Sequence, residues 1–81
     1  MKARVYVSLK STVLDPQGQT IQAALNSHGY RDIAGVRQGK YFEIALDPAT
    51  PAEKAHKDID AIARDVLTNP VIEEYRVEFL D

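Results

Sequence analysis

The sequence predicts an α+β domain in which a four-stranded sheet carries two helices on one face. Two stretches show helical periodicity, and they alternate with stretches in which apolar residues recur at every second position. The expected order is β-α-β-β-α-β. Packing both helices on one face is the economical way to bury their apolar stripes. With 81 residues, the chain is expected to form a single domain over residues 1–81.

The first strand and the first helix have clear local signals. Residues 3–9 alternate between apolar and polar side chains, which is typical of a half-buried strand. Asp15 can cap a helix that starts at Pro16, because proline lacks an amide donor that this position does not need. Gly29 is expected to end the helix after about His28 in a left-handed conformation. An inward stripe is expected from Ile21, Ala24, Leu25 and His28.

Residues 33–46 are expected to form a β-hairpin with arms at 33–38 and 41–46. Gly39 would provide the positive φ that a tight turn requires. A turn at Gly35 is the alternative, and it would shift the register of the pairing.

A second helix is expected over residues 51–68. Thr50 and Glu53 have capping-box spacing, and Pro70 disfavours helical geometry in the residue before it. Its expected buried face consists of Ala55, Ile59, Ile62, Ala63 and Val66. The last strand should run from Val71 or Ile72 to Leu80, with Tyr75, Val77 and Phe79 inward. The whole outline is ferredoxin-like.

The face of the sheet opposite the helices should be open. It would present Tyr and Arg side chains, which are favoured at protein interfaces. A chain this short buries only roughly 60–65% of its unfolded surface, so burial against another chain would help it. Unpaired edge strands offer a second route to association, and a plain solvated face is the alternative. The expected self-association face consists of Arg4, Tyr6, Tyr41, Glu43, Arg76 and Glu78.

Composition argues against several classes of function. The net charge is −2 with scattered basic residues, which opposes binding to nucleic acid. No apolar run approaches the roughly 20 residues that span a bilayer, and the early strand pattern leaves no room for a signal peptide. The absence of cysteine excludes disulfides and thiolate metal sites. We therefore expect a cytoplasmic protein.

No catalytic constellation is visible in the sequence. His56 and Asp60 lie one helical turn apart, but a metal site needs three or four ligands. His28 near a helix C-terminus is more simply a favourable contact with the helix dipole. No serine has a His–carboxylate pair beside it, and the glycines match no phosphate loop. We expect no catalytic, cofactor-binding or metal-binding residue here.

Two stretches contain residues that local structure alone does not account for. Glycine in a first helical turn costs about 1 kcal/mol relative to alanine, so something is expected to approach the backbone at Gly18. Arg37 and Lys40 flank the expected hairpin turn, which is either a solvated tip or a docking tip for an acidic partner or a phosphate. A third stretch, residues 69–75, could be only a helix stop and a strand start.

Taken together, these stretches resemble one known family. They read VSLK and VLDPQG at residues 7–10 and 13–18, VRQGK at 36–40, and NPVIEEY at 69–75. In order, spacing and chain length they resemble the PurS family, the small subunits of phosphoribosylformylglycinamidine (FGAM) synthase. Residues 51–68 carry no such signature.

The resemblance implies a role in purine biosynthesis. The complete synthase converts formylglycinamide ribonucleotide, glutamine and ATP into formylglycinamidine ribonucleotide, glutamate, ADP and phosphate. A glutaminase subunit releases ammonia, and a large subunit, on which ATP and Mg are expected, uses it. The small subunit is implied to be non-catalytic, to form a dimer or tetramer, and to bridge the two catalytic subunits for ammonia transfer.

The resembling blocks are the expected contacts with the catalytic subunits. Holding two active sites in a fixed relation would be a proximity effect, with no chemical step on this chain. The expected contact residues are Asp15, Pro16, Gln17, Gly18, Arg37, Gly39, Lys40, Asn69, Pro70, Ile72, Glu73 and Tyr75.

Other functions use the same order of elements. A regulatory domain that binds a small molecule at a dimer interface is the main alternative, although it usually has a glycine-rich first loop, absent at residues 10–13. Acylphosphatase-type enzymes need an arginine in a phosphate loop after the first strand, where this chain has Lys10. RNA-recognition modules stack bases on aromatics within a signature that is absent here.

Overall fold

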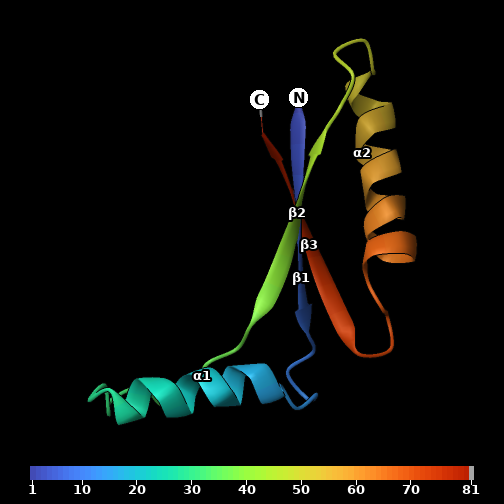
Figure 1. The fold of residues 1–81 in the computed structure, drawn as a ribbon. Helices are drawn as coiled ribbons and strands as arrows, with labels where there is room; N and C mark the ends of the chain where they lie inside the picture. Colours follow the sequence, from blue (N-terminus) through green and yellow to red (C-terminus); the bar gives the residue numbers. More distant parts are fainter. Residues whose placement is uncertain (81) are drawn as a thin grey trace.

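The computed structural model describes residues 1–80 and shows a three-stranded sheet with two helices. Strand β1 lies in the centre and pairs antiparallel with β2 on one side and β3 on the other. Helix α2 lies alongside the sheet, whereas α1 extends sideways from its end (Figure 1). The elements are β1 (Lys2–Leu9), α1 (Pro16–Ser27), β2 (Gly39–Ala45), α2 (Ala52–Ile62), its π-helical continuation η1 (Ala63–Leu67) and β3 (Glu73–Leu80).

The prediction of four strands is wrong, because residues 33–38 form no strand. Strand β2 pairs with β1 from Lys2↔Ala45 to Ser8↔Gly39, so the residues before Gly39 run past the end of β1 and have no strand to pair with. Gly39 is therefore the first residue of β2 and not a turn residue. Within residues 1–80, Gly29 is the one glycine with a positive φ, at 99°.

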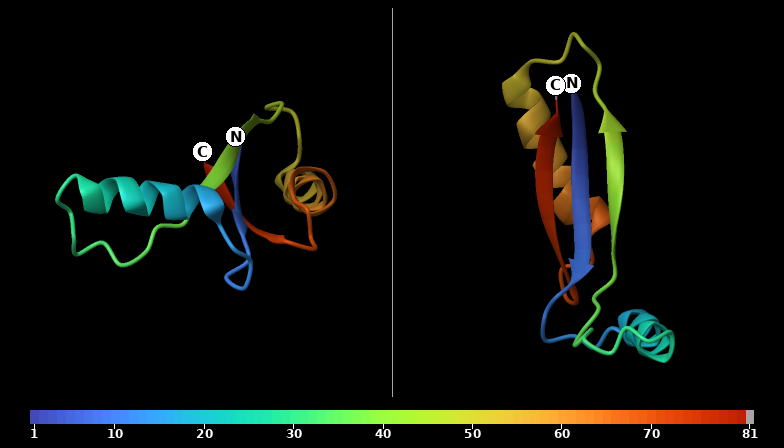
Figure 2. Two further views of the ribbon diagram at one scale, coloured as in Figure 1. Left: turned by 60° about the horizontal axis from the view of Figure 1, so that its bottom comes forward. Right: turned by 90° about the vertical axis from the view of Figure 1, so that its left-hand side faces the viewer.

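The expectation that both helices cover one face is also wrong. Gly18 is the only buried residue of α1, and Ile21 of the expected inward stripe is 38% exposed. Because β2 returns antiparallel beside β1, no crossover carries α1 back over the sheet. Both views in Figure 2 show α1 and the segment after it extending beyond the sheet. The molecule is accordingly elongated, with extents of 51 × 27 × 13 Å.

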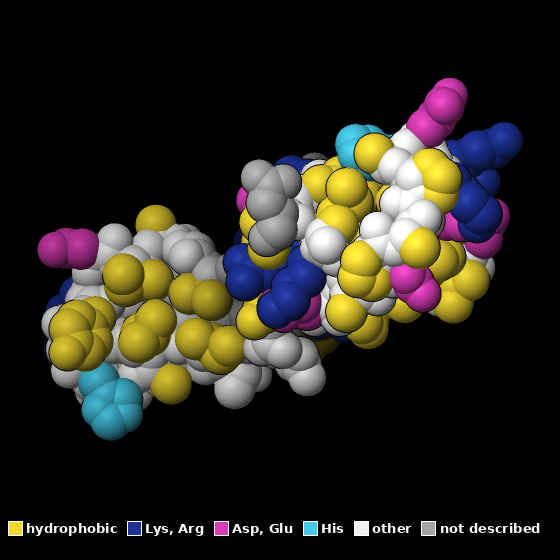
Figure 3. All heavy atoms as spheres, turned by 90° about the horizontal axis from the view of Figure 1, so that it is seen from above, with side chains coloured by type: hydrophobic (Ala, Val, Ile, Leu, Met, Phe, Trp, Pro, Cys, Tyr) yellow, Lys and Arg dark blue, Asp and Glu magenta, His cyan; other side chains and the backbone are white. Residues whose placement is uncertain are grey.

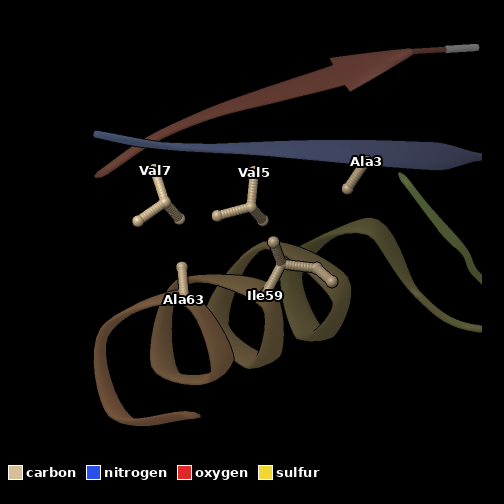
Figure 4. Close-up of a cluster of buried hydrophobic side chains, with 5 residues drawn as sticks. All are labelled: Ala3, Val5, Val7, Ile59 and Ala63. Atoms are coloured by element: carbon tan, nitrogen blue, oxygen red, sulfur yellow. The ribbon is translucent and has the colours of Figure 1, made fainter. Parts of the chain in front are cut away.

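The core lies between β1 and α2. Figure 4 shows Ala3, Val5 and Val7 pointing toward Ile59 and Ala63. These five side chains are at most 2% exposed. Half-buried residues packed around them are Phe42, Ile44, Leu46, Ile62, Leu67, Tyr75, Val77 and Phe79. The alternation expected for the first strand is confirmed for Val5 and Val7, and the inward residues expected for the last strand, Tyr75, Val77 and Phe79, are confirmed as well.

One expected core residue of the second helix is misplaced. Val66 is 73% exposed, whereas Leu67 packs against the core. The helix changes from α to π geometry at Ala63, and the wider turn rotates the following side chains relative to an α-helical pattern.

The start and end of α1 follow the local signals, but the start of α2 does not. The Asp15 side chain accepts a hydrogen bond from the Gly18 amide, and Gly29 follows the helix with its left-handed φ. At α2 the expected capping box is absent. Pro51, in an extended conformation, occupies the N-cap position and provides no side-chain hydrogen bond.

Candidate functional site

The three blocks of sequence meet at one end of the sheet, and Lys10 connects them. Its amide donates to the Ile72 carbonyl at 2.9 Å, and its Nζ donates to the Pro70 carbonyl at 2.8 Å. Its own carbonyl accepts from Arg37 at 2.9 Å. We call this end of the sheet the junction, defined as residues 10–18, 36–40 and 69–73. Chain positions up to about sixty residues apart thus form one surface region.

The two cations of the second block have different roles at the junction. Arg37 Nη2 donates to the carbonyls of Lys10 and Val13, both at 2.9 Å, so this guanidinium holds the loop that follows β1. Lys40 is exposed, and its Nζ lies 3.9 Å from a carboxylate oxygen of Glu73. Lys40 is therefore the better placed of the two to meet a partner.

Asp15 is 4% exposed, and both of its carboxylate oxygens are bound within the chain. Oδ1 accepts from the Gly18 amide at 2.9 Å, and Oδ2 accepts from the Gln38 amide at 2.7 Å. These hydrogen bonds, from Gln38 foremost and then Gly18, hold the pKa of Asp15 below its usual value, and the charge of Arg37 acts in the same direction.

Gly18 has the close neighbour that its position suggested. A Cβ at this residue would lie 2.3 Å from the carbonyl oxygen of Val36, closer than any side chain tolerates. The group that approaches the backbone is therefore part of the same chain. Asp15 and Gly18 are both buried, whereas Pro16 and Gln17 between them are exposed.

The Asp15 carboxylate should make the fold sensitive to acid. Its pKa in the folded chain lies below the unfolded value of about 3.9, so its stabilisation is complete above that pH and is lost as the pH falls through the folded pKa. We expect Asp15→Asn to lower stability at neutral pH and to flatten the loss of stability below about pH 4. Urea denaturation across pH measures both effects.

The matched control is Asp47→Asn, which removes the same charge from an exposed loop. The pKa values of Glu43 and Asp65 are also held low, by Lys2 and Arg64 respectively. In Asp15→Asn the loss of stability at low pH should therefore become smaller without disappearing. If stability fell as steeply below about pH 4 in Asp15→Asn as in Asp47→Asn, the Asp15 carboxylate would not be a source of the acid sensitivity.

A shallow depression of about 200 Å³ lies at the junction. Gln17, Gln38, Lys40 and Glu73 contribute polar groups to its lining, and Gln38 Nε2 donates to Gln17 Oε1. Small-molecule sites are usually enclosed and mostly apolar. An open depression in which these polar groups lie beside the apolar side chains of Val7 and Leu9 is better suited to a protein contact.

The third block divides between the junction and the α2 side of the sheet. The Asn69 amide donates to Glu73 Oε1 at 2.7 Å, and Pro70 and Ile72 are exposed. Tyr75 instead faces α2, where its hydroxyl donates to Asp60 at 3.1 Å. Burial, and then the hydrogen bond to Asp60, raise the pKa of Tyr75.

His56 and Asp60 are both engaged in contacts with the sheet. The His56 ring stacks on Phe79 with 3.9 Å between ring centres, and Asp60 accepts from Tyr75. No group of three or more His, Cys, Asp or Glu residues that could hold a metal ion is found in the part of the chain that the structure describes. Within residues 1–80, no helix has the length and apolar character needed to cross a bilayer.

The residues expected for self-association lie on the face opposite α2. The right-hand view of Figure 2 shows this face uncovered, with α2 behind the sheet. Cross-strand pairing places Tyr6 beside Tyr41, with 5.8 Å between ring centres, and places Arg76 over the Tyr6 ring at 4.2 Å. Arg4 pairs with Glu43 and Glu78, and its Nε lies 3.4 Å from a Glu43 oxygen.

The sequence did not predict the exposed apolar surface of α1 and the segment after it. Figure 3 shows hydrophobic side chains gathered on this projecting lobe, and Ile21, Tyr30 and Ile33 are among the exposed large hydrophobic residues. The stripe itself was visible as a helical pattern, but its partner surface was assigned to the sheet. The roles of Lys10 and Gln38 were also missed, because they depend on hydrogen bonds between distant segments.

Comparisons with known proteins agree on one family. The model of the PurS family, described as phosphoribosylformylglycinamidine (FGAM) synthase, matches residues 2–81. The PurS subunit of this synthase from Bacillus subtilis is 44% identical over 81 residues, which cover 95% of this chain and 89% of the relative.

Solved structures agree with the sequence matches. A Bacillus subtilis PurS structure superposes with a TM-score of 0.81 at 40% identity, covering 99% of this chain and 98% of that one. A chain in the structure of PurLQS from Thermotoga maritima gives a TM-score of 0.86 at 33% identity, covering 98% and 95%. These structures share the fold over nearly the whole chain.

Proposed function

Because the chain belongs to the PurS family of FGAM synthase subunits, which serve purine biosynthesis, we propose that it is a non-catalytic structural subunit of that enzyme. The observation that carries this proposal is the junction, where three separated blocks connected by Lys10 form one open surface. Its polar groups lie beside the exposed apolar side chains of Leu14, Val71 and Ile72. The similarity to a chain of PurLQS supports partners of the same enzyme, namely a glutaminase subunit and a large synthetase subunit.

The proposed mechanism is geometric. Ammonia released at one active site must reach another without escaping or being protonated, so a fixed relation between the two sites favours its use. This chain would supply interface area and remove orientational freedom, while bonds are made and broken on the partners. ATP and Mg would bind the large subunit, none of the cofactors would bind this chain, and the complex would work in the cytoplasm.

Self-association is the second part of the proposal. On the open face Tyr6 lies between Tyr41 and Arg76 and contacts both, and such residues dominate the binding energy of many interfaces. Both β2 and β3 are edge strands among the described residues, which offers a further route to pairing between copies. We propose a dimer or tetramer that presents its junctions to the catalytic subunits.

Charge reversal at Lys40 tests the junction as a docking surface. Lys40→Glu should weaken assembly with the glutaminase and the large subunit by roughly tenfold or more, because an acidic partner surface would then face a like charge. The measurement is co-elution of the three purified subunits in size-exclusion chromatography with light scattering, over a concentration series. Arg37 is left unchanged because it holds the loop after β1.

Two further variants make the result specific. Lys57→Glu reverses an exposed charge on α2, away from the junction, and should assemble normally. Combining Lys40→Glu with Glu73→Lys restores a positive charge beside the same depression and should recover part of the assembly. Equal assembly of the wild-type chain and Lys40→Glu would show that the junction is not part of the docking surface.

A further inference from the structure

We propose that Asp15 and Gly18 form a joint that fixes the direction of a projecting arm relative to the sheet. The arm consists of α1 and the segment 28–36 that returns from it. The resemblance placed both residues among the partner contacts, yet both are buried and their neighbours belong to the same chain. Their role is therefore internal: they set the direction of the arm.

The arm holds itself together as one body. Asn26 Nδ2 donates to the Tyr30 carbonyl at 2.9 Å, and both Asn26 and Gln22 also reach the Ile33 carbonyl at 3.4 Å. The returning segment is thus tied to the helix along its length. Apart from Gly18 at the root of the arm, no residue of α1 is buried.

The Asp15 carboxylate connects the two chain segments at this root. Oδ1 binds the amide of Gly18 in the first turn of α1, and Oδ2 binds the amide of Gln38, directly before β2. Arg37 supports the same connection by binding the carbonyls of Lys10 and Val13. One side chain therefore joins the first turn of the arm to the residue that leads from the arm into β2.

Gly18 sets how closely the two segments approach. The Val36 carbonyl oxygen occupies the space of the missing side chain, 2.3 Å from the position that a Cβ would take. The Val36 oxygen belongs to the backbone, and a Cβ is bonded directly to the backbone, so neither atom could move aside by a side-chain rotation. An added methyl group at Gly18 would therefore displace the returning segment. The joint thus requires a glycine on one side and a carboxylate on the other.

The consequence for assembly rests on the proposed function. An arm with a fixed direction presents its exposed apolar side chains, among them Ile21 and Tyr30, at a defined place relative to the sheet. Holding such an element in its docking position before binding reduces the entropy lost on association.

Distance measurements between spin labels test the joint in the full-length chain. The sequence contains no cysteine, so Ala23→Cys on α1 and Lys57→Cys on α2, both at exposed positions, provide one specific label pair. Double electron–electron resonance is measured on labelled chain diluted into unlabelled chain, which suppresses distances between copies. The wild-type background should give a single narrow distance peak.

Gly18→Ala should replace that peak with a broad or shifted distribution. Gly35→Ala is the matched control, because no atom lies within 4 Å of its Cβ position and its φ is not positive. Hydrogen exchange of the β1 amides should show the same protection in both variants, which separates movement of the arm from loss of the core. Asp15→Asn, which adds no bulk, should also broaden the distribution and replaces Gly18→Ala if that variant does not fold.

A narrow, unshifted peak in the folded Gly18→Ala or Asp15→Asn chain would overturn the joint. This outcome differs from failure of the proposed function, because it is measured without the catalytic subunits. Loss of assembly in a variant whose arm has not moved would likewise overturn the inference, and would show that these residues affect partners by another route.

Discussion

Ile59→Ala should destabilise the chain by about 2–5 kcal/mol, the usual range for an isoleucine removed from a packed core. Ile59 is fully buried and packs against the three small apolar side chains of β1. Because α2 is the only helix among residues 1–80 that covers the sheet, these residues provide no second layer to fill the cavity. A domain of this size has a free energy of unfolding of roughly 4–12 kcal/mol, so this single change removes a large part of it.

Urea denaturation followed by far-UV circular dichroism measures this loss. Val66→Ala is the control, because Val66 lies shortly after Ile59 along the same helical run yet is 73% exposed, and its truncation should change stability by less than about 0.5 kcal/mol. Similar losses for the two variants would show that the helix does not bury the face described here.

If copies of the chain associate through the open face, as proposed, Tyr41→Ala should dissociate the dimer or tetramer while the single chain stays folded. Tyr41 lies on the open face beside Tyr6. It is 59% exposed, so more than half of its surface is available for contact with another copy of the chain. An aromatic side chain central to an interface is worth about 2 kcal/mol or more, which corresponds to a dissociation constant roughly 30-fold higher. Sedimentation velocity over a dilution series measures the shift.

Tyr30→Ala distinguishes the open face from the arm. Tyr30 is 63% exposed, so its truncation removes the same chemical group, with similar access to solvent, from the segment that follows α1. If the open face carries self-association, Tyr30→Ala should keep the wild-type dissociation constant. A larger loss for Tyr30→Ala than for Tyr41→Ala would move the self-association surface to the arm.

Features that depend on neighbouring residues could be predicted from the sequence. Alternation in residues 3–9 and in the last strand gave the correct faces, because side-chain direction in a strand depends on position and not on the partner. Asp15, Pro16 and Gly29 gave the limits of α1 for the same reason. Each signal concerns hydrogen bonds or dihedral angles within a few residues.

Features that depend on distant segments could not be predicted in this way. Residues 33–38 have a strand-like composition, yet β1 ends before they could pair with it. The stripe of α1 indicated a helix but not the surface that it faces. The position of Val66 depends on a π-helical turn, which leaves no simple mark in the hydrophobic pattern.

The candidate site shows the same division. Its residues were found because they form three blocks that resemble a family, whereas their meeting at one end of the sheet depends on the hydrogen bonds of Lys10. Residues that were all expected to contact partners also differ in how far they are buried. Asp15 and Gly18 are buried, while Lys40, which lines the depression at the junction, is exposed.

The nitrogen source used by the reconstituted synthase tests the central claim most directly. The glutaminase and large subunits are assayed with and without this chain, once with glutamine and once with free ammonia. The account predicts that glutamine-dependent product formation requires the chain, whereas ammonia-dependent formation changes far less. Equal use of glutamine without the chain, or product formation by the chain alone, would contradict a purely structural role.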